Sequence, residues 1–597
     1  VIAGLSTTQV GALTTAQLGV MSTDDILALG TAQVKALNTN TLVSLGTTQV
    51  AALTTSQVAG LSVAAVAVLS STQLSALTTT QVQSHTANQV KALDANKVAA
   101  MTTTQVAAFT SDQIKSLSAA QLQALTTSEV AAMSTGQLKA LSDTQIKSLT
   151  SDAVAAMTTA QVNALTTAQL KALSSSQVTA LTSTNVAALG TSQISALSSS
   201  QVQALTTGHV AILNTAQVSA LSTDQIAAFS TAQVVAMTTS QVASLSAAQV
   251  KGMGTDQVKA LENADVQVLN ATQIKALTTA QVQALETTDV AGLNTTQLAA
   301  LTADQVSALT TAQVVSLTTS EVSNLSYDQV KAFTTTQLAA VETADIAVLN
   351  SDQVSSLSAT QVQAFTTAQV EKLSTGVIAG LTNTQVDALS TAQVVALTTT
   401  QVGALTAGAV TALSSGQVAA LTNGQLGALS TTQVQAMDVT DVSAMSTAQV
   451  NALSTTQVAA LTTGQVAGLT TTQVSSLADA KLQAVSTAGI AALTSDQVVS
   501  LTTGQVAAIT TTQLQALTNS SVNALTTTQV TALGATQVAS LTTGTVTALS
   551  SDQIASLTTT QVGALTTSQV AAVKADQVVA LTTTQVAKLS TTQLGAL

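Results

Sequence analysis

The sequence predicts an all-α solenoid of very short capped helices, one in each eight-residue repeat, here called an octad. Apolar residues recur every eight positions in two columns, a leucine column from Leu5 to Leu597 and a valine column from Ile2 to Leu594. A Ser or Thr usually follows the leucine column, and a Gln usually stands three residues later. These observations indicate one helix start, repeated without a change of register over residues 1–597.

The two apolar columns predict a single continuous core. The leucine column has 75 members, namely 58 Leu, 8 Met, 4 Phe, 3 Val, 1 Ile and 1 His. The valine column contains only Val, Ile or Leu. A small residue, most often Ala, precedes most leucine-column members and is expected to let neighbouring backbones approach. We therefore expect one array over residues 1–597, with no linker and no domain boundary.

Neither a long helix nor a simple strand fits this spacing. Eight residues advance an α-helix by about 800°, so the leucine column would rotate and never form one face. In a strand, the two columns would point to opposite faces, because their positions differ by three or by five, both odd numbers. We therefore expect a short element in each octad, with a break between successive elements.

The column after leucine identifies the break as a helix N-cap. It has 74 members, 57 of them Ser or Thr, and most others are Asn, Asp or Gly, as at Asn38 and Gly46. Helix N-caps prefer these residues because a short side-chain oxygen accepts a bond from a first-turn N–H. Gln fills 55 of the 75 positions of the glutamine column. Ser/Thr-x-x-Gln is the capping box, and residues 165–172 contain it in full.

The charges follow the same period. Of 27 carboxylates, 25 lie between the N-cap and the third helical residue; the exceptions are Glu371 and Asp387. Of 15 Lys, 12 lie in the two positions after the valine column. This distribution complements a separate helix dipole in each octad. An isolated helix of fewer than about 12 residues is not stable, so successive octads must coil and pack together.

A β-solenoid is the alternative fold. Thr and Val favour strands. An even repeat length of eight would also keep each column on one face of a strand. The scarcity of Gly turns, the Ala and Gln content, and a column that selects Asn, Asp and Gly together favour the helical interpretation.

The sequence offers few side chains for chemistry. Charged residues make up 7% of the chain, against about 25% in a typical domain, and Cys is absent. His85 and His209 lie far apart, with no Cys to complete a metal site. The closest carboxylates, Asp24 with Asp25 and Asp438 with Asp441, occupy cap positions that the helix dipole explains. We expect no enzyme and no catalytic, cofactor-binding or metal-binding residues.

Partners of two kinds are not expected. The net charge of −12, with Lys as the only basic residue apart from His, argues against nucleic-acid binding. No apolar run approaches the roughly 18 residues of a membrane span. Tyr327 follows a cap and is expected on the surface. Neither end carries an atypical capping repeat, so we expect a continuing array or self-association.

The consensus Leu-Thr-Thr-x-Gln-Val-x-Ala-Leu, as in residues 53–61, resembles the octapeptide tracts of very large repetitive bacterial surface and secreted proteins. Such proteins are adhesin-like or filament-forming. The resemblance spans the whole chain and implies export and a place outside the bacterial cell or on its surface. It implies no functional residues, because the array has none to match.

Three functions suit an array of this kind. The first is structural, as an extended extracellular rod, stalk or filament. The second is adhesion, in which the Thr/Ser/Gln-rich face binds a cell-surface or environmental polymer through many weak contacts. The third is ice binding, for which Thr pairs on short helices are less suited than flat alternating rows.

Overall fold

The structure is a computed structural model that describes every residue from Val1 to Leu597. It contains one 3-10 helix, Ile2–Gly4, and 74 α-helices, without any strand. The helical prediction is therefore confirmed, and the β-solenoid alternative is wrong. The helices run from α1 (Thr7–Gly11) to α74 (Thr591–Leu594), and helix αn begins at residue 8n − 1. Each has four to six residues, and none combines the length and apolar character needed to cross a bilayer.

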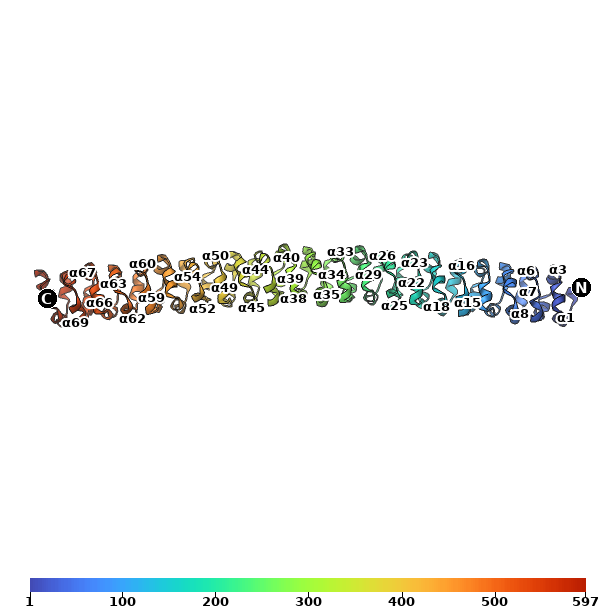
Figure 1. The fold of residues 1–597 in the computed structure, drawn as a ribbon, viewed down its shortest axis with the longest axis horizontal. Helices are drawn as coiled ribbons and strands as arrows, with labels where there is room; N and C mark the ends of the chain where they lie inside the picture. Colours follow the sequence, from blue (N-terminus) through green and yellow to red (C-terminus); the bar gives the residue numbers. More distant parts are fainter. The chain divides into compact units, whose positions relative to one another are not determined.

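The chain divides into two compact units, Val1–Ala300 and Leu301–Leu597. Figure 1 shows that the short helices of each unit wind in sequence order, from blue to green in the first and on to red in the second. Within each unit, a helix packs on the helix three places before it, as α7 (Thr55–Gly60) packs on α4 (Thr31–Lys35). The octad register crosses residue 300 without insertion or deletion, and one array over residues 1–597 stays a prediction.

The capping box forms as the sequence predicts. In α7, the Thr54 N–H donates to Gln57 Oε1 at 2.6 Å, and the Gln57 N–H donates to Thr54 Oγ1 at 3.2 Å. The helix ends at Gly60, and Leu61 is extended with φ −53° and ψ 140°. Because the next cap is extended as well, six helical and two extended residues fill one octad.

The two apolar columns form the core of each unit. Val58 is completely buried and Leu61 is 5% exposed. The larger members of the leucine column, such as Met101 and Phe109, are buried in the same way. One octad has too little apolar surface to cover its own core residues, so neighbouring turns of the solenoid bury them.

The small residue before each leucine-column member lies against an earlier helix. A Cβ added at Gly60 would lie 3.4 Å from the Cβ of Thr31, the first residue of α4. At Gly468, the last residue of α58 (Thr463–Gly468), an added Cβ would lie 2.1 Å from Cγ1 of Val439. The predicted close approach of backbones at this position is thus present.

Candidate functional site

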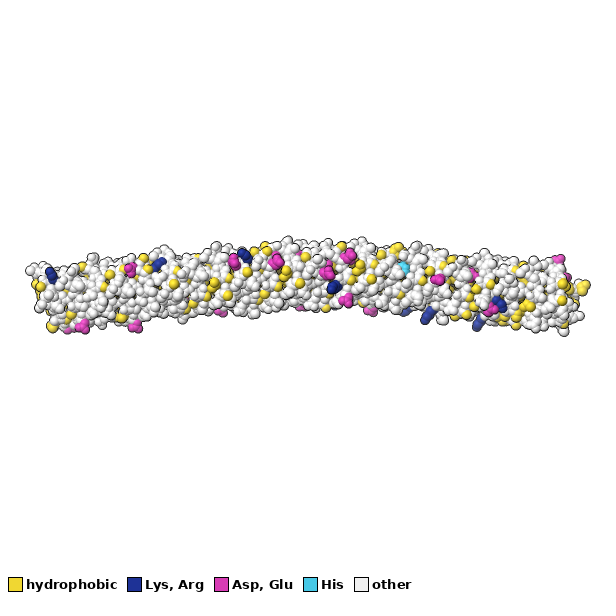
Figure 2. All heavy atoms as spheres, viewed as in Figure 1, with side chains coloured by type: hydrophobic (Ala, Val, Ile, Leu, Met, Phe, Trp, Pro, Cys, Tyr) yellow, Lys and Arg dark blue, Asp and Glu magenta, His cyan; other side chains and the backbone are white.

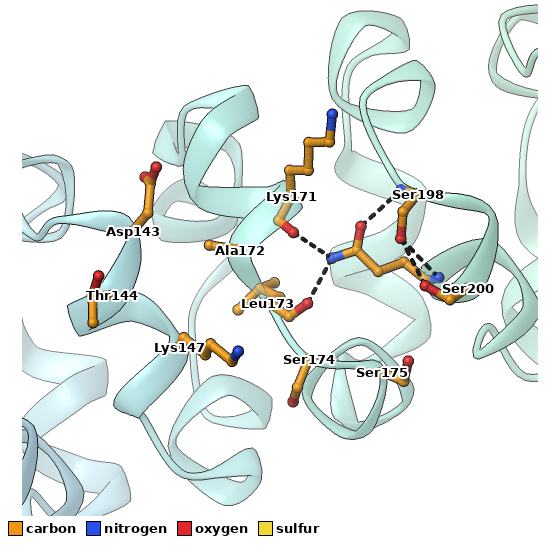
Figure 3. A pocket seen from close by; sticks show the side chains of 11 residues that line it. Asp143, Thr144, Lys147, Lys171, Ala172, Leu173, Ser174, Ser175, Ser198 and Ser200 are labelled. Atoms are coloured by element: carbon orange, nitrogen blue, oxygen red, sulfur yellow. Dashed lines mark hydrogen bonds between the residues drawn. The ribbon is translucent and has the colours of Figure 1, made fainter.

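The glutamine column joins each helix start to the preceding turn of the solenoid, as Gln201 shows. Its Oε1 accepts from the Ser198 N–H at 2.8 Å, and its own N–H donates to Ser198 Oγ at 3.2 Å. Its Nε2 donates to the carbonyl oxygens of Lys171 at 3.3 Å and Leu173 at 2.7 Å (Figure 3). A third Nε2 contact, to the Leu170 oxygen, measures 2.8 Å. One amide thus caps its own helix and binds the turn before it.

These contacts recur along both units. Gln57 Nε2 donates to the oxygens of Ile26 and Leu29, which lie 31 and 28 residues earlier. Gln425 Nε2 reaches Leu397, also 28 residues earlier, at 2.7 Å. The acceptors lie in the last turn of a helix or just after it, where carbonyl groups lack the regular helical partner. The Leu170 oxygen also accepts from the Leu173 N–H at 3.2 Å. We call this set of amide-to-carbonyl bonds the glutamine ladder.

Sequence reasoning predicted only the accepting half of this side chain. The capping box explains Oε1, but it leaves the two protons on Nε2 without a role. A signal was present, because Glu serves a capping box as well as Gln does, yet 55 of 75 positions are Gln. Only the amide provides an acceptor for the cap and donors for the preceding turn.

Some octads replace glutamine with another donor. Lys97 Nζ donates to the oxygen of Ala67, and Lys481 Nζ donates to the oxygen of Leu453. Asn185 Nδ2 donates at 2.9 Å to the carbonyl 28 residues before it. In two octads, a carbonyl oxygen of the ladder therefore accepts a hydrogen bond from a positively charged ammonium group.

Other octads replace glutamine with a carboxylic acid. Such a side chain can accept the cap N–H, but when ionised it has no proton for the ladder carbonyls. Burial is the largest cause that raises the pKa of five of these acids, because desolvation disfavours the charged form. They are Glu129, Asp265, Asp289, Asp345 and Asp441.

The two histidines occupy different columns. His85, in the leucine column, is buried at the end of α10 (Thr79–Ser84), and its Nε2 has no hydrogen-bond partner. His209 replaces a glutamine, and its Nδ1 accepts from the Thr206 N–H at 3.3 Å. Burial lowers the pKa of both imidazoles. No three or more His, Asp or Glu side chains are grouped to hold a metal ion.

The carboxylate pairs lie at helix starts, as expected. Asp25 Oδ2 accepts from the Ser22 hydroxyl at 2.8 Å and the Ser22 N–H at 3.0 Å, and these bonds lower its pKa. Asp441 Oδ2 accepts from the Asp438 N–H at 2.9 Å, and its Oδ1 accepts from the Ser415 hydroxyl at 3.1 Å. One acid of each pair, Asp25 and Asp441, therefore contributes to capping.

The surface carries shallow hollows that repeat with the octads. Figure 2 shows few and scattered charged side chains among uncharged ones. Lys147, Lys171, Ser174 and Ser198 help to line the hollow in Figure 3. Equivalent residues line a hollow three octads later and another seven octads earlier. Since the same hollow recurs, its shape comes from the repeat and does not mark one unique site. Tyr327 is 58% exposed on this surface.

A family model described as the ALTTAQ repeat matches the chain in overlapping segments. Together they cover residues 2–63, 86–119, 122–319, 338–407, 434–471, 474–543 and 546–575, which is more than half of the sequence. No curated protein matches the chain. The prediction of a tandem repeat protein is confirmed: the chain belongs to the ALTTAQ repeat family.

Proposed function

We propose that this chain is a non-catalytic structural array that forms an extended rod, stalk or filament. The observation that carries the proposal is the glutamine ladder, which joins turn to turn within each unit. Each turn presents the next with the same carbonyl oxygens, so the array can continue for any number of octads. Identical turns suit a protein that spans a distance better than one that holds a single substrate.

We also propose that the array acts outside the cell, as part of a bacterial surface or secreted structure. The resemblance of the octad to tracts of such proteins supports this location. The short links between helices support it too, because long exposed loops are the preferred sites of proteolysis. Antibody labelling of intact producing cells should give a signal, and labelling that needs permeabilised cells would contradict this location.

Electron microscopy of the purified chain tests the structural role. We expect uniform elongated particles, because each octad adds the same rise. Variants that lack whole octads should give particles shortened in proportion to the residues removed. Compact particles, or particles whose length does not change with octad number, would refute the structural proposal.

Adhesion is a second candidate, and the recurring hollows support it. A polymer with its own regular repeat could contact several equivalent hollows, and weak contacts would then add up. Binding to immobilised polysaccharides should strengthen steeply with octad number if this role is correct. Affinity that does not depend on octad number would argue against it. Ice binding has less support, because the Thr pairs lie at an N-cap and a first helical residue, as Thr54 and Thr55 do, and not in flat alternating rows.

A further inference from the structure

Four octads carry an acid at the N-cap and another acid in place of glutamine. We call them the paired-acid octads: Glu262 with Asp265, Glu286 with Asp289, Glu342 with Asp345, and Asp438 with Asp441. One further N-cap is acidic, Asp94, and in that octad the glutamine column holds Lys97. Two like charges at one helix start, one of them buried, are unfavourable unless a positive charge or a proton compensates them.

The octad of Asp345 differs from the other three. Asp265, Asp289 and Asp441 each accept the N–H of their acidic cap, at 3.3, 2.9 and 2.9 Å. Asp345 lies in α43 (Thr343–Ile346), where no capping box forms. Its side chain is 3% exposed, and its Oδ2 has no hydrogen-bond partner. A buried carboxylate oxygen without a donor is costly to maintain.

By its register, Asp345 occupies the position from which a glutamine amide reaches three carbonyl oxygens. In the neighbouring octad, Gln337 donates to carbonyls 31, 30 and 28 residues earlier, at 3.0, 3.2 and 2.7 Å. The same register at residue 345 gives the carbonyls of Val314, Val315 and Leu317. Aspartate is one methylene shorter than glutamine and ends before the place that the amide nitrogen fills. In this octad the carboxylate and the three carbonyl oxygens therefore lack the amide protons that join them in the neighbouring octad.

The surrounding charges are negative. Glu321 belongs to α40 (Thr319–Asn324), which packs against α43. Glu321 is 7% exposed, and its Oε2 accepts from the Thr318 N–H at 2.6 Å. After burial, the charges of Glu342 and then Glu321 are the next causes that raise the pKa of Asp345.

We propose that this place binds a divalent cation of the Ca²⁺ class, held by Asp345 and the carbonyl oxygens of the preceding turn. Ca²⁺ takes six to eight oxygen ligands, from carboxylates, backbone carbonyls and water, in flexible geometry. No three acidic side chains converge as a cage, so the backbone supplies several ligands, while Glu321 and Glu342 add negative potential. The ammonium groups of Lys97 and Lys481 lie against ladder carbonyls in their own octads. In the octad of Asp345 the cation comes from solution instead.

Hydrogen exchange on the full chain, stripped with a chelator and titrated with Ca²⁺ at neutral pH, tests the site. At a Ca²⁺ concentration of about 100 times Kd, local opening of α40 and α43 should become about 100-fold rarer, and amide exchange correspondingly slower. Asp345→Gln removes a ligand and completes the glutamine ladder, so its α43 should be protected without Ca²⁺ and show no response to it. Calorimetry should count one bound Ca²⁺ fewer in this variant.

Two further variants make the result decisive. Asp345→Lys carries its own ammonium, as Lys97 does, and should also be protected without Ca²⁺. Asp352→Asn removes an exposed carboxylate from α44 (Ser351–Ser355) and should keep the full response. The proposal fails if Ca²⁺ does not slow exchange in the unaltered chain, if Asp345→Gln responds equally, or if only acidification protects α43. The last result would identify a proton as the compensating charge. None of these outcomes bears on the structural role proposed above.

Discussion

At the residue scale, the side-chain nitrogen Nε2 of the glutamine column joins two turns of the solenoid, and an octad with a carboxylic acid in this column lacks it. Glutamine and glutamate cap a helix equally well, but only glutamine also donates to the preceding turn. Gln201 is 2% exposed, and its bonds to the carbonyl oxygens of Leu170 and Leu173 are buried with it. The glutamine column therefore determines how firmly neighbouring turns are held together.

Replacing this nitrogen should weaken the connection between turns. Gln201→Glu keeps the cap acceptor, but it removes the Nε2 donor and brings a negative charge toward carbonyl oxygens. We expect a loss of at least about 1–3 kcal/mol in local stability at neutral pH. Gln203→Glu, on an exposed face of the same helix, should change it by less than about 0.5 kcal/mol. Hydrogen exchange of the flanking helices measures both, and equal effects would contradict a role for the ladder.

Acids already present in the ladder predict a pH dependence. Burial raises the pKa of Glu129 in the folded chain, so the folded state binds more protons than the unfolded state between the ordinary and the raised pKa. Stability from this group is complete below the ordinary pKa and is lost as pH rises through that window. Local exchange near Glu129 should therefore accelerate as pH rises, after correction for the intrinsic rate. Glu129→Gln should abolish this part of the pH dependence; an unchanged profile would show that another group causes it.

Close packing between turns makes one helical glycine necessary. Ala is favoured over Gly in a helix by about 1 kcal/mol, yet a Cβ at Gly468 would lie 2.1 Å from Cγ1 of Val439. Gly468→Ala should therefore destabilise α58 despite the gain in helix propensity. Val439→Thr, which restores the common residue of that column, should relieve the clash, because in the equivalent pair a Cβ added at Gly252 would lie 3.8 Å from Cγ2 of Thr223. Val439→Ala should relieve it as well, and thermal unfolding of the double variants checks this; failure would place the clash elsewhere.

At the element scale, each helix depends on its cap and on the turn beneath it. Ser198→Ala removes the acceptor of the Gln201 N–H and should lower the stability of the helix by about 0.5–2 kcal/mol. Ser198→Gly should lower it by only about 0.3 kcal/mol. Gly is already tolerated at this column, as at Gly190 and Gly254. Exchange rates within the helix that follows Ser198 provide the measurement. Equal losses in the two variants would show that backbone freedom, and not the cap bond, limits stability.

The sequence was sufficient to predict the helices, because every signal for them lies within one octad. The cap at Thr54, the box with Gln57 and the buried pair of Val58 and Leu61 are all visible in nine residues. The winding of the solenoid could not be predicted in the same way. It depends on the dihedral angles of two extended residues, and small differences in them accumulate from octad to octad. For this reason the partners of Gln57 Nε2, 28 and 31 residues away, were not identified.

The candidate sites show the same limit. The sequence placed His85 in the leucine column, where the core was predicted, and His85 is 7% exposed. It did not distinguish Asp345 from the other capping acids, because the missing cap bond and the oxygen atoms of the previous turn are properties of packing. The only indication in the sequence was that some octads carry acids at both the N-cap and the glutamine column. Its meaning depended on knowing what the glutamine amide contacts.

At the scale of the whole molecule, the uniform register should make the array tolerant of changes by whole octads. Deleting residues 199–206 brings equivalent residues into every position, so the glutamine ladder can re-form with new partners. Deleting residues 199–202 shifts the apolar columns by half an octad and should disrupt several neighbouring turns. Circular dichroism per residue should be unchanged in the first variant and reduced in the second. Equal loss in both would contradict the equivalence of octads.

The amides of the glutamine ladder, such as those of Gln57 and Gln201, reach toward residues that precede them in the chain, which gives assembly of the solenoid a direction. An octad that leaves a ribosome or a translocation pore carries its donors with it, and its acceptors have already emerged 28 to 31 residues ahead. The ladder bonds of an octad therefore need nothing that is synthesised later. After a first turn has formed, each new octad needs only to dock on a finished end, so folding can keep pace with emergence however long the array becomes.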